Sequence, residues 1–343
     1  MDKMTSKEMY YRRLIPEKLK YFLTEGGKLH WLFNLVKGRN DLDFLIGANN
    51  SKQWISVYCG TTRLLEITLA GRLVRLSADK KYINLAKSVS LNIYGVKEIA
   101  NLNFEDEFVQ FLSLLHQNNH LERYYGNKKE GYFQNLFSRQ FGILSSGSEE
   151  FVVIDKEAVV GYKNMEIKAK YFDRQREKFK AIKQHLSEFD AKRYGRNIGQ
   201  EALGNELDFL AVDRSGKVLF IEFKHGSSTK GIYLSPIQIG LYCSIFQDYI
   251  DLYKHSFIDD IGDMIKQKKD LELISRDFPE VKPSGDIVPM LIIAEYNSRS
   301  SSLDSFRNVL QICREELEDD AFLSDLKVYE YDEGQKLIPL QYC

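Results

Sequence analysis

Three ionisable residues lie on two short apolar segments in the second half of the chain. Asp208 stands near the start of LDFLAVD, and Glu222 and Lys224 lie at the end of KVLFIEFK. Alternate residues of a strand share a face, so Glu222 and Lys224 point the same way if their segment is a strand. Arg-Ser-Gly joins the two segments, which predicts a β-hairpin that places Asp208 beside the other two.

Two carboxylates and a lysine on an apolar sheet favour chemistry on a phosphate ester. Burying such charges is costly unless they pair with one another or bind a metal. Carboxylate oxygens suit Mg²⁺ or Mn²⁺, which keep several waters and bind substrate phosphate. The lysine would orient or deprotonate a bound water and neutralise the charge that develops on the phosphate. The alternative is an ordinary polar strand face, which an isolated Glu-x-Lys usually is.

The run GNELDFLAVDRSGKVLFIEFKHG resembles the hairpin of the PD-(D/E)xK nuclease superfamily. Asp208 matches the family's metal-binding aspartate, Glu222 its second acidic ligand and Lys224 its motif lysine, while Leu207 stands where the family usually has proline. The resemblance implies a metal-dependent nuclease with a restriction-endonuclease-like mixed sheet flanked by helices. It also implies the carbonyl of Phe223 as a further metal ligand.

Gln238 and Tyr242 fit the Q-x-x-x-Y element of RecB-like members of that superfamily. On a helix the two residues are one turn apart and face the same way, and the resemblance implies that they orient substrate. RecB-like nucleases often hold an iron–sulfur cluster with four cysteines. The cysteines here are scattered, so no cluster is expected; they are Cys59, Cys243, Cys313 and Cys343.

The resemblance also implies an upstream helical glutamate that completes the site. Glu130, which opens the helical segment KEGYFQNLFSRQF, is the first candidate. Glu201 and Glu206 are the alternatives, and Glu206 shares a strand face with Asp208.

Strands and helices alternate around the hairpin, which predicts an α/β (α+β) protein. Hydrophobic periodicity predicts further elements. Helices are expected at 16–37, 105–120, 129–141, 168–189, 236–249 and 302–318, and strands at 151–155, 287–296 and 326–331. Ser235 is expected as the N-cap of the 236–249 helix, with Pro236 at its first position.

A strand-rich stretch up to about residue 90 predicts a small antiparallel sheet near the N-terminus. With 343 residues, the chain is expected to form two domains. The predicted boundaries are 1–120 for an N-terminal accessory domain of a helix and this sheet, and 121–343 for the nuclease-like domain.

The chain has a net charge of −1, yet positions 162–200 carry 11 Lys and Arg against 5 Asp and Glu. A local basic surface attracts a polyanion whatever the net charge. The predicted partner is therefore nucleic acid, with DNA favoured over RNA, in repair or in defence against foreign DNA; a homodimer is left open. The rival function is a non-catalytic nucleic-acid-binding or scaffolding protein that keeps the nuclease fold.

Other functions lack the sequence motifs that they need. No apolar run is long enough for a membrane span, no export signal is evident, and the scattered cysteines fit a reducing compartment, so a cytoplasmic location is expected. No phosphate-binding loop, serine-hydrolase elbow or dinucleotide fingerprint occurs. His116 and His120 lack the glutamate of a zinc H-E-x-x-H helix, and His225 is expected in a loop.

Overall fold

The computed structural model describes residues 7–49, 52–118, 120–121, 123–194, 203–204, 206–317 and 321–342. Helices and mixed and antiparallel sheets alternate along these residues, which confirms the expected α/β class. None of the helices in these ranges is both long enough and apolar enough to cross a membrane.

The chain divides into two compact units, each built from separate segments. The first unit takes Met1–Tyr11, Val153–Gly262 and Glu280–Cys343, and the second takes Arg12–Val152 and Asp263–Pro279. The sequence placed a single boundary after residue 120. The division lies elsewhere because residues beyond 120 pack into the second unit.

Two contacts within the second unit show why the division falls where it does. Arg139 donates hydrogen bonds to the carbonyls of Val36 and Leu42, which ties its helix to the N-terminal part of the unit. The side-chain amide of Gln267 both accepts from and donates to the backbone of Ile15, at 3.0 and 2.9 Å.

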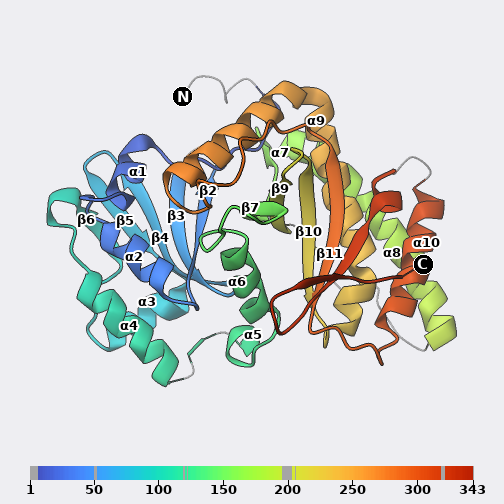
Figure 1. Ribbon diagram of the computed structural model, residues 1–343, viewed down its shortest axis with the longest axis horizontal. Helices are drawn as coiled ribbons and strands as arrows, with labels where there is room; N and C mark the ends of the chain where they lie inside the picture. The colour runs from blue at the N-terminus through green and yellow to red at the C-terminus, as the bar shows by residue number, and fades with distance from the viewer. Residues whose placement is uncertain are drawn as a thin grey trace. The chain divides into compact units, whose positions relative to one another are not determined.

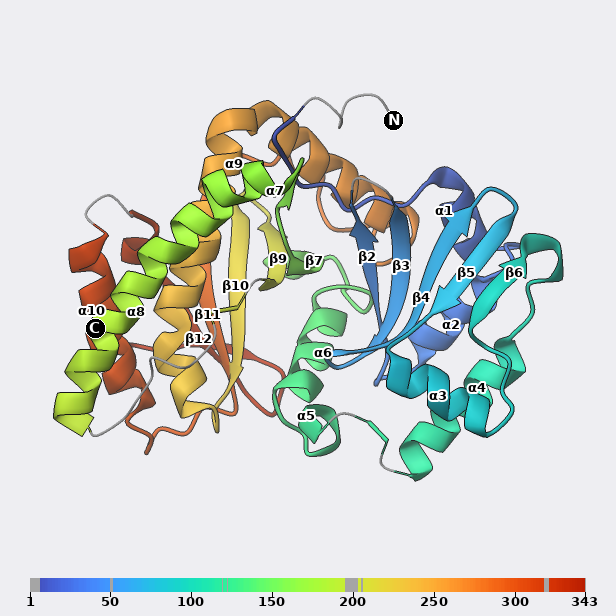
Figure 2. The ribbon, with the colours of Figure 1, turned by 180° about the vertical axis from the view of Figure 1, so that it is seen from behind.

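The second unit is built on a five-stranded antiparallel sheet in the order β2-β3-β4-β5-β6. Helices α1 and α2 lie on one face of this sheet (Figures 1 and 2). Apolar side chains of the helices and the strands form a common core. The strands are β2 (Asp43–Ala48), β3 (Gln53–Cys59), β4 (Thr62–Ala70), β5 (Leu73–Ser77) and β6 (Gly95–Glu98). The helices are α1 (Glu17–Leu23), α2 (His30–Gly38), α3 (Lys80–Ser88), η1 (Ile99–Asn101), α4 (Glu105–Gln117), α5 (Arg123–Gly126) and α6 (Glu130–Gln140).

The single helix expected at 16–37 is wrong, since α1 and α2 are separate. Gly26 has a φ of +77°, a left-handed conformation that ends a helix and favours glycine. At Gly27 a β-carbon would overlap the carbonyls of Tyr21 and Phe22, so the chain folds back there in a way that only glycine allows.

The first unit is built on a six-stranded mixed sheet in the order β13-β12-β11-β10-β9-β7. Strand β10 lies inside the sheet, antiparallel to β9 and parallel to β11. The strands are β7 (Phe151–Ala158), β9 (Leu207–Asp213), β10 (Val218–His225), β11 (Ile287–Ala294), β12 (Lys327–Tyr331) and β13 (Leu337–Pro339). A separate pair, β1 (Met9–Tyr10) and β8 (Gly161–Tyr162), is antiparallel.

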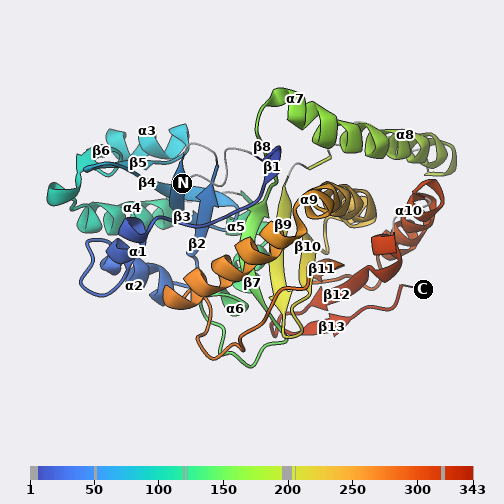
Figure 3. The ribbon, with the colours of Figure 1, turned by 90° about the horizontal axis from the view of Figure 1, so that it is seen from above.

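Helices α8 and α10 and the first part of α9 cover one face of the six-stranded sheet (Figure 3). Strand β10 connects to the parallel strand β11 through α9, as a parallel pair requires. The helical elements are α7 (Met165–Lys168), the π-helical η2 (Ala169–Asp173), α8 (Arg174–Tyr194), α9 (Thr229–Asp270), α10 (Ser302–Glu316) and η3 (Ala321–Asp325). Along α8 the apolar side chains of Phe179, Ile182 and Leu186 are buried, as their helical spacing within the expected helix 168–189 predicts.

Helix α9 begins at Thr229, seven residues before the start expected at Pro236. A proline inside a helix removes the amide that would bond to the carbonyl four residues earlier. Here that carbonyl belongs to Ile232, and the buried hydroxyl of Ser235 donates to it at 2.6 Å. Ser235 is therefore no N-cap, because it supplies the hydrogen bond that Pro236 cannot. The helix continues to a kink at Tyr253, beyond which a second helical stretch runs to Asp270.

Candidate active site

The β9–β10 hairpin brings the acidic residues and the lysine to one place. Its turn is set by Asp213, whose carboxylate accepts hydrogen bonds from the amides of Ser215 and Lys217, and by Gly216 at a φ of +87°. This turn fixes the pairing of Phe209 with Ile221. The next residues of each strand, Asp208 and Glu222, then lie beside each other.

Lys224 lies between the two carboxylates. Its ammonium nitrogen Nζ is 2.5 Å from Oε1 of Glu222 and 3.6 Å from Oδ2 of Asp208. The hairpin thus gathers three of the predicted site residues, and we call this group the Asp208–Glu222–Lys224 triad.

Burial deepens across the triad. The exposed fractions of the side chains are 23% for Asp208, 10% for Lys224 and 2% for Glu222. A carboxylate as buried as that of Glu222 is stable only with a partner of opposite charge, and the ammonium of Lys224 is that partner. The triad therefore opens to solvent on the side of Asp208.

Asp208 is also held by the backbone of the neighbouring strand. Its Oδ2 accepts a hydrogen bond from the amide of Phe223 at 2.8 Å. The ring of Phe223 packs on the opposite face, with its centre 6.0 Å from that of Phe209 and 6.1 Å from that of Tyr331. The backbone of Phe223 thus lies next to the carboxylates, while the role of its carbonyl as a metal ligand stays a prediction.

Helix α9 places Tyr242 and Gln238 close to the segment that leads into β9. A β-carbon at Gly204 would overlap the Tyr242 hydroxyl and would lie 3.4 Å from Nε2 of Gln238. Burial raises the pKa of Tyr242 above its ordinary value, and the charges of Glu222 and Asp208 raise it further. Tyr242 therefore stays protonated beside the triad. No sequence pattern singled out Gly204, where the Tyr242 hydroxyl leaves no space for a β-carbon.

The candidates for a helical glutamate fall in different places. Glu130 opens α6 and belongs to the second unit, so its place in a site with the triad stays a prediction. Glu201 lies outside the described residues. Glu206 is exposed, and its backbone amide donates a hydrogen bond to the hydroxyl oxygen of Tyr242.

His225 is not in a loop, contrary to the expectation. It is the last residue of β10 and is buried, with Nδ1 2.8 Å from Oγ of Ser227 and Nε2 3.3 Å from Oε2 of Glu295. Glu295 follows β11, and no pattern in the sequence linked it to the hairpin 70 residues earlier.

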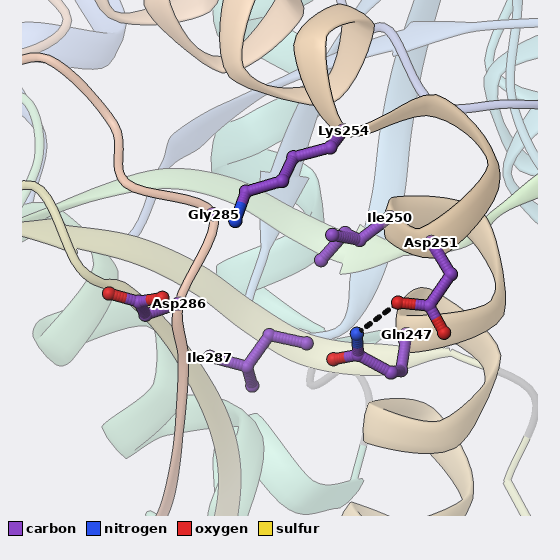
Figure 4. A pocket seen from close by; sticks show the side chains of 7 residues that line it. All are labelled: Gln247, Ile250, Asp251, Lys254, Gly285, Asp286 and Ile287. Atoms are coloured by element: carbon purple, nitrogen blue, oxygen red, sulfur yellow. Dashed lines mark hydrogen bonds between the residues drawn. The ribbon is translucent and has the colours of Figure 1, made fainter.

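The first unit contains a hollow of about 420 Å³ (Figure 4). Ile287 lines it and pairs with Val218, so the hollow adjoins the first residues of β10 and β11, whereas the triad lies near the end of β10. Its other lining residues are Gln247, Ile250, Asp251, Lys254, Gly285 and Asp286. No predicted site residue lines it.

The carboxylate oxygens of Asp208 and Glu222 are suitable ligands for a small hard cation, but they are only two side chains. Within the described ranges no group of three or more His, Cys, Asp or Glu is arranged to hold a metal. Two carboxylates are nevertheless the protein share that Mg²⁺ commonly takes, because it keeps several waters and binds substrate phosphate. The carboxylate of Asp208 is partly exposed, so water can reach the triad from that side.

The basic segment before the hairpin contributes exposed cations. Lys178 and Lys180 are exposed on α8, and Lys180 forms an ion pair with Glu177 at 2.5 Å. Arg174 at the start of the helix forms an ion pair with Asp248 at 2.9 Å. Ion pairs therefore offset part of the positive charge that the sequence showed.

Comparison of the chain with protein-family models, with curated proteins and with solved structures found no match.

Proposed function

We propose that this chain is a metal-dependent nuclease that hydrolyses phosphodiester bonds in nucleic acid, with DNA as the favoured substrate. The observation that carries the proposal is the ammonium of Lys224 between the carboxylates of Glu222 and Asp208 on adjacent strands. The order of elements along the chain also supports the proposal, because it is the order that the resemblance implies. The strand with Asp208 is followed by a turn, the strand with Glu222, and the helix with Gln238 and Tyr242.

Asp208 and Glu222 would hold Mg²⁺ or Mn²⁺, together with the carbonyl of Phe223. The ion would supply a bound water of lowered pKa and positive charge for the phosphate. The ammonium of Lys224 would donate a hydrogen bond that orients this water, and it would stabilise the negative charge on the phosphate oxygens as the phosphorus–oxygen bond to the leaving group breaks. Gln238 and the protonated Tyr242 hydrogen-bond the substrate from the helix side.

The exposed lysines of α8 would contact phosphates of the substrate backbone. Such contacts give affinity without sequence readout and weaken as salt rises.

A cleavage assay tests the proposal directly. The wild-type chain with Mg²⁺ or Mn²⁺ is expected to cut linear, circular or single-stranded DNA, or RNA, and EDTA is expected to stop it. The substitution Lys224→Ala is expected to abolish cutting, while Lys254→Ala, which removes a lysine of the hollow, serves as the matched control. If wild type and Lys224→Ala give identical products, the catalytic proposal fails.

Binding without cleavage would support the rival function, a nucleic-acid-binding scaffold with the same fold. In that case wild type shifts DNA in a gel at low salt but leaves its length unchanged with either metal ion. Retention of both carboxylates and the lysine in one ion-paired group favours the catalytic function.

A further inference from the structure

Gly226 follows β10 directly and lies in close contact with the end of β11, just beyond the triad. His225 pairs with Ala294, and the amide of Gly226 donates to the carbonyl of Ala294 at 2.7 Å. A β-carbon on Gly226 would overlap the carbonyl of Glu295. Only glycine fits at position 226 with the two strand ends in this arrangement.

Glu295 has a backbone conformation that residues with a β-carbon rarely adopt. Its φ is +50°, in the left-handed region that favours glycine. Its amide donates to the carbonyl of Tyr331 on β12 at 3.1 Å, which fixes the backbone there. A non-glycine residue in such a conformation is maintained by its surroundings and is a pointer to function.

The side chain of Glu295 explains why glutamate occupies this position. The backbone amide of Ser227 lies 3.1 Å from Nδ1 of His225 and can only donate, so Nδ1 accepts. In the neutral ring the proton is then on Nε2, which lies 3.3 Å from Oε2 of Glu295 and donates to it. The carboxylate thus holds a buried imidazole in one orientation.

His225 and Lys224 are adjacent on β10 and point to opposite faces of the sheet. Lys224 reaches the carboxylates of the triad, and His225 reaches Glu295. A rotation of the strand end that moved one side chain would therefore move the other. The bond to Glu295 restrains that rotation.

We propose that Glu295, acting through His225, is a positioning residue that fixes the ammonium of Lys224 between Glu222 and Asp208 for cleavage. The inference rests on the proposed nuclease function and adds to it a residue outside the hairpin. Glu295 touches neither the substrate nor the metal in this role.

Two substitutions at position 295 separate positioning from simple stability. Glu295→Gly suits the left-handed backbone but removes the acceptor for His225, whereas Glu295→Gln keeps an acceptor oxygen. Gln335 also has a left-handed φ, +60°, in the turn between β12 and β13, so Gln335→Gly relieves backbone strain away from His225 and serves as the control.

The measurements are kcat and KM for cleavage with saturating Mn²⁺, and the melting temperature of each variant. Glu295→Gly is expected to melt no lower than wild type, to lose about tenfold or more in kcat, since small misplacements are costly, and to keep its KM. Glu295→Gln is expected to stay within about twofold of wild type in kcat, and Gln335→Gly to match it, because neither change releases Lys224.

The outcomes distinguish this inference from the proposed function. Full kcat in Glu295→Gly, with wild type active, overturns the positioning role alone and leaves the nuclease in place. An equal loss in Glu295→Gln and Glu295→Gly also overturns it, because the retained acceptor should rescue activity. A wild-type chain that cuts nothing overturns both proposals together.

Discussion

The carboxylate of Asp208 accepts a hydrogen bond from the backbone amide of Phe223, 2.8 Å away on the neighbouring strand. The amide belongs to the residue between Glu222 and Lys224. The orientation of Asp208 is therefore set by the backbone of the strand that carries the other two members of the triad. A neutral side chain with an oxygen acceptor at position 208 can still accept from the Phe223 amide. The charge of Asp208 can therefore be tested separately from this hydrogen bond.

Asp208→Asn is expected to preserve stability and to lose metal affinity. The asparagine oxygen can still accept from Phe223, but one of two carboxylates is gone. We expect Mn²⁺ affinity, measured by calorimetry, to fall at least about tenfold, since even groups that only support a metal ligand cost that much.

Asp286→Asn, which removes a carboxylate at the hollow, is the control and should bind Mn²⁺ like wild type. Equal Mn²⁺ affinity of Asp208→Asn and wild type would show that the triad is a structural ion pair.

Removal of the lysine charge is expected to destabilise the first unit through Glu222. Lys224→Met leaves a carboxylate that is 2% exposed without its cation, and such a loss costs about 3–5 kcal/mol. The double variant Glu222→Gln with Lys224→Met removes both charges and should recover most of that free energy of unfolding in urea. If the double variant is as unstable as the single one, the two charges are not coupled.

The hydroxyl of Ser235 is expected to matter only because of Pro236. Ser235→Ala leaves the Ile232 carbonyl without its 2.6 Å donor and should cost about 1 kcal/mol of the free energy of unfolding. In a Pro236→Ala background the restored amide can bond to that carbonyl, so the same change should cost clearly less. A cost that is identical in both backgrounds would show that Ser235 does not replace the missing amide.

Substitutions at Gly204 and Tyr242 are expected to have non-additive effects on stability, because the Tyr242 hydroxyl occupies the space that a β-carbon at position 204 would need. Gly204→Ala places a β-carbon against the Tyr242 hydroxyl and should lower the melting temperature. Tyr242→Phe removes that hydroxyl and with it the overlap. We expect Gly204→Ala to be less destabilising in the Tyr242→Phe chain than in wild type; additive losses would contradict the contact.

The hairpin was predictable because its signals are local. Strand alternation puts Glu222 and Lys224 on one face, and a short turn with Gly216 sets the register that brings Asp208 beside them. Strand β2 gave no such signal, because DFLIGA is buried along its whole length and shows no alternation.

Features that depend on distant or unusual contacts were not predictable. Pro236 reads as a helix start, and only the bond from Ser235 to Ile232 shows why the helix extends past it on both sides. The contact of His225 with Glu295 joins residues 70 positions apart and depends on a left-handed backbone that periodicity does not encode.

The first residues of the described chain pack against residues that are translated much later, which has a consequence for synthesis on the ribosome. Strand β1 pairs with β8, and Tyr11, which follows β1, makes a second contact of this kind. The hydroxyl of Tyr11 donates to the buried carboxylate of Asp155, 144 residues later, within the same compact unit. The N-terminal strand therefore emerges long before its partner is translated, and it must remain available while Arg12–Val152 is made. A fragment that begins at residue 121 would lack this strand altogether, and Asp155 would lose the tyrosine that the intact chain provides.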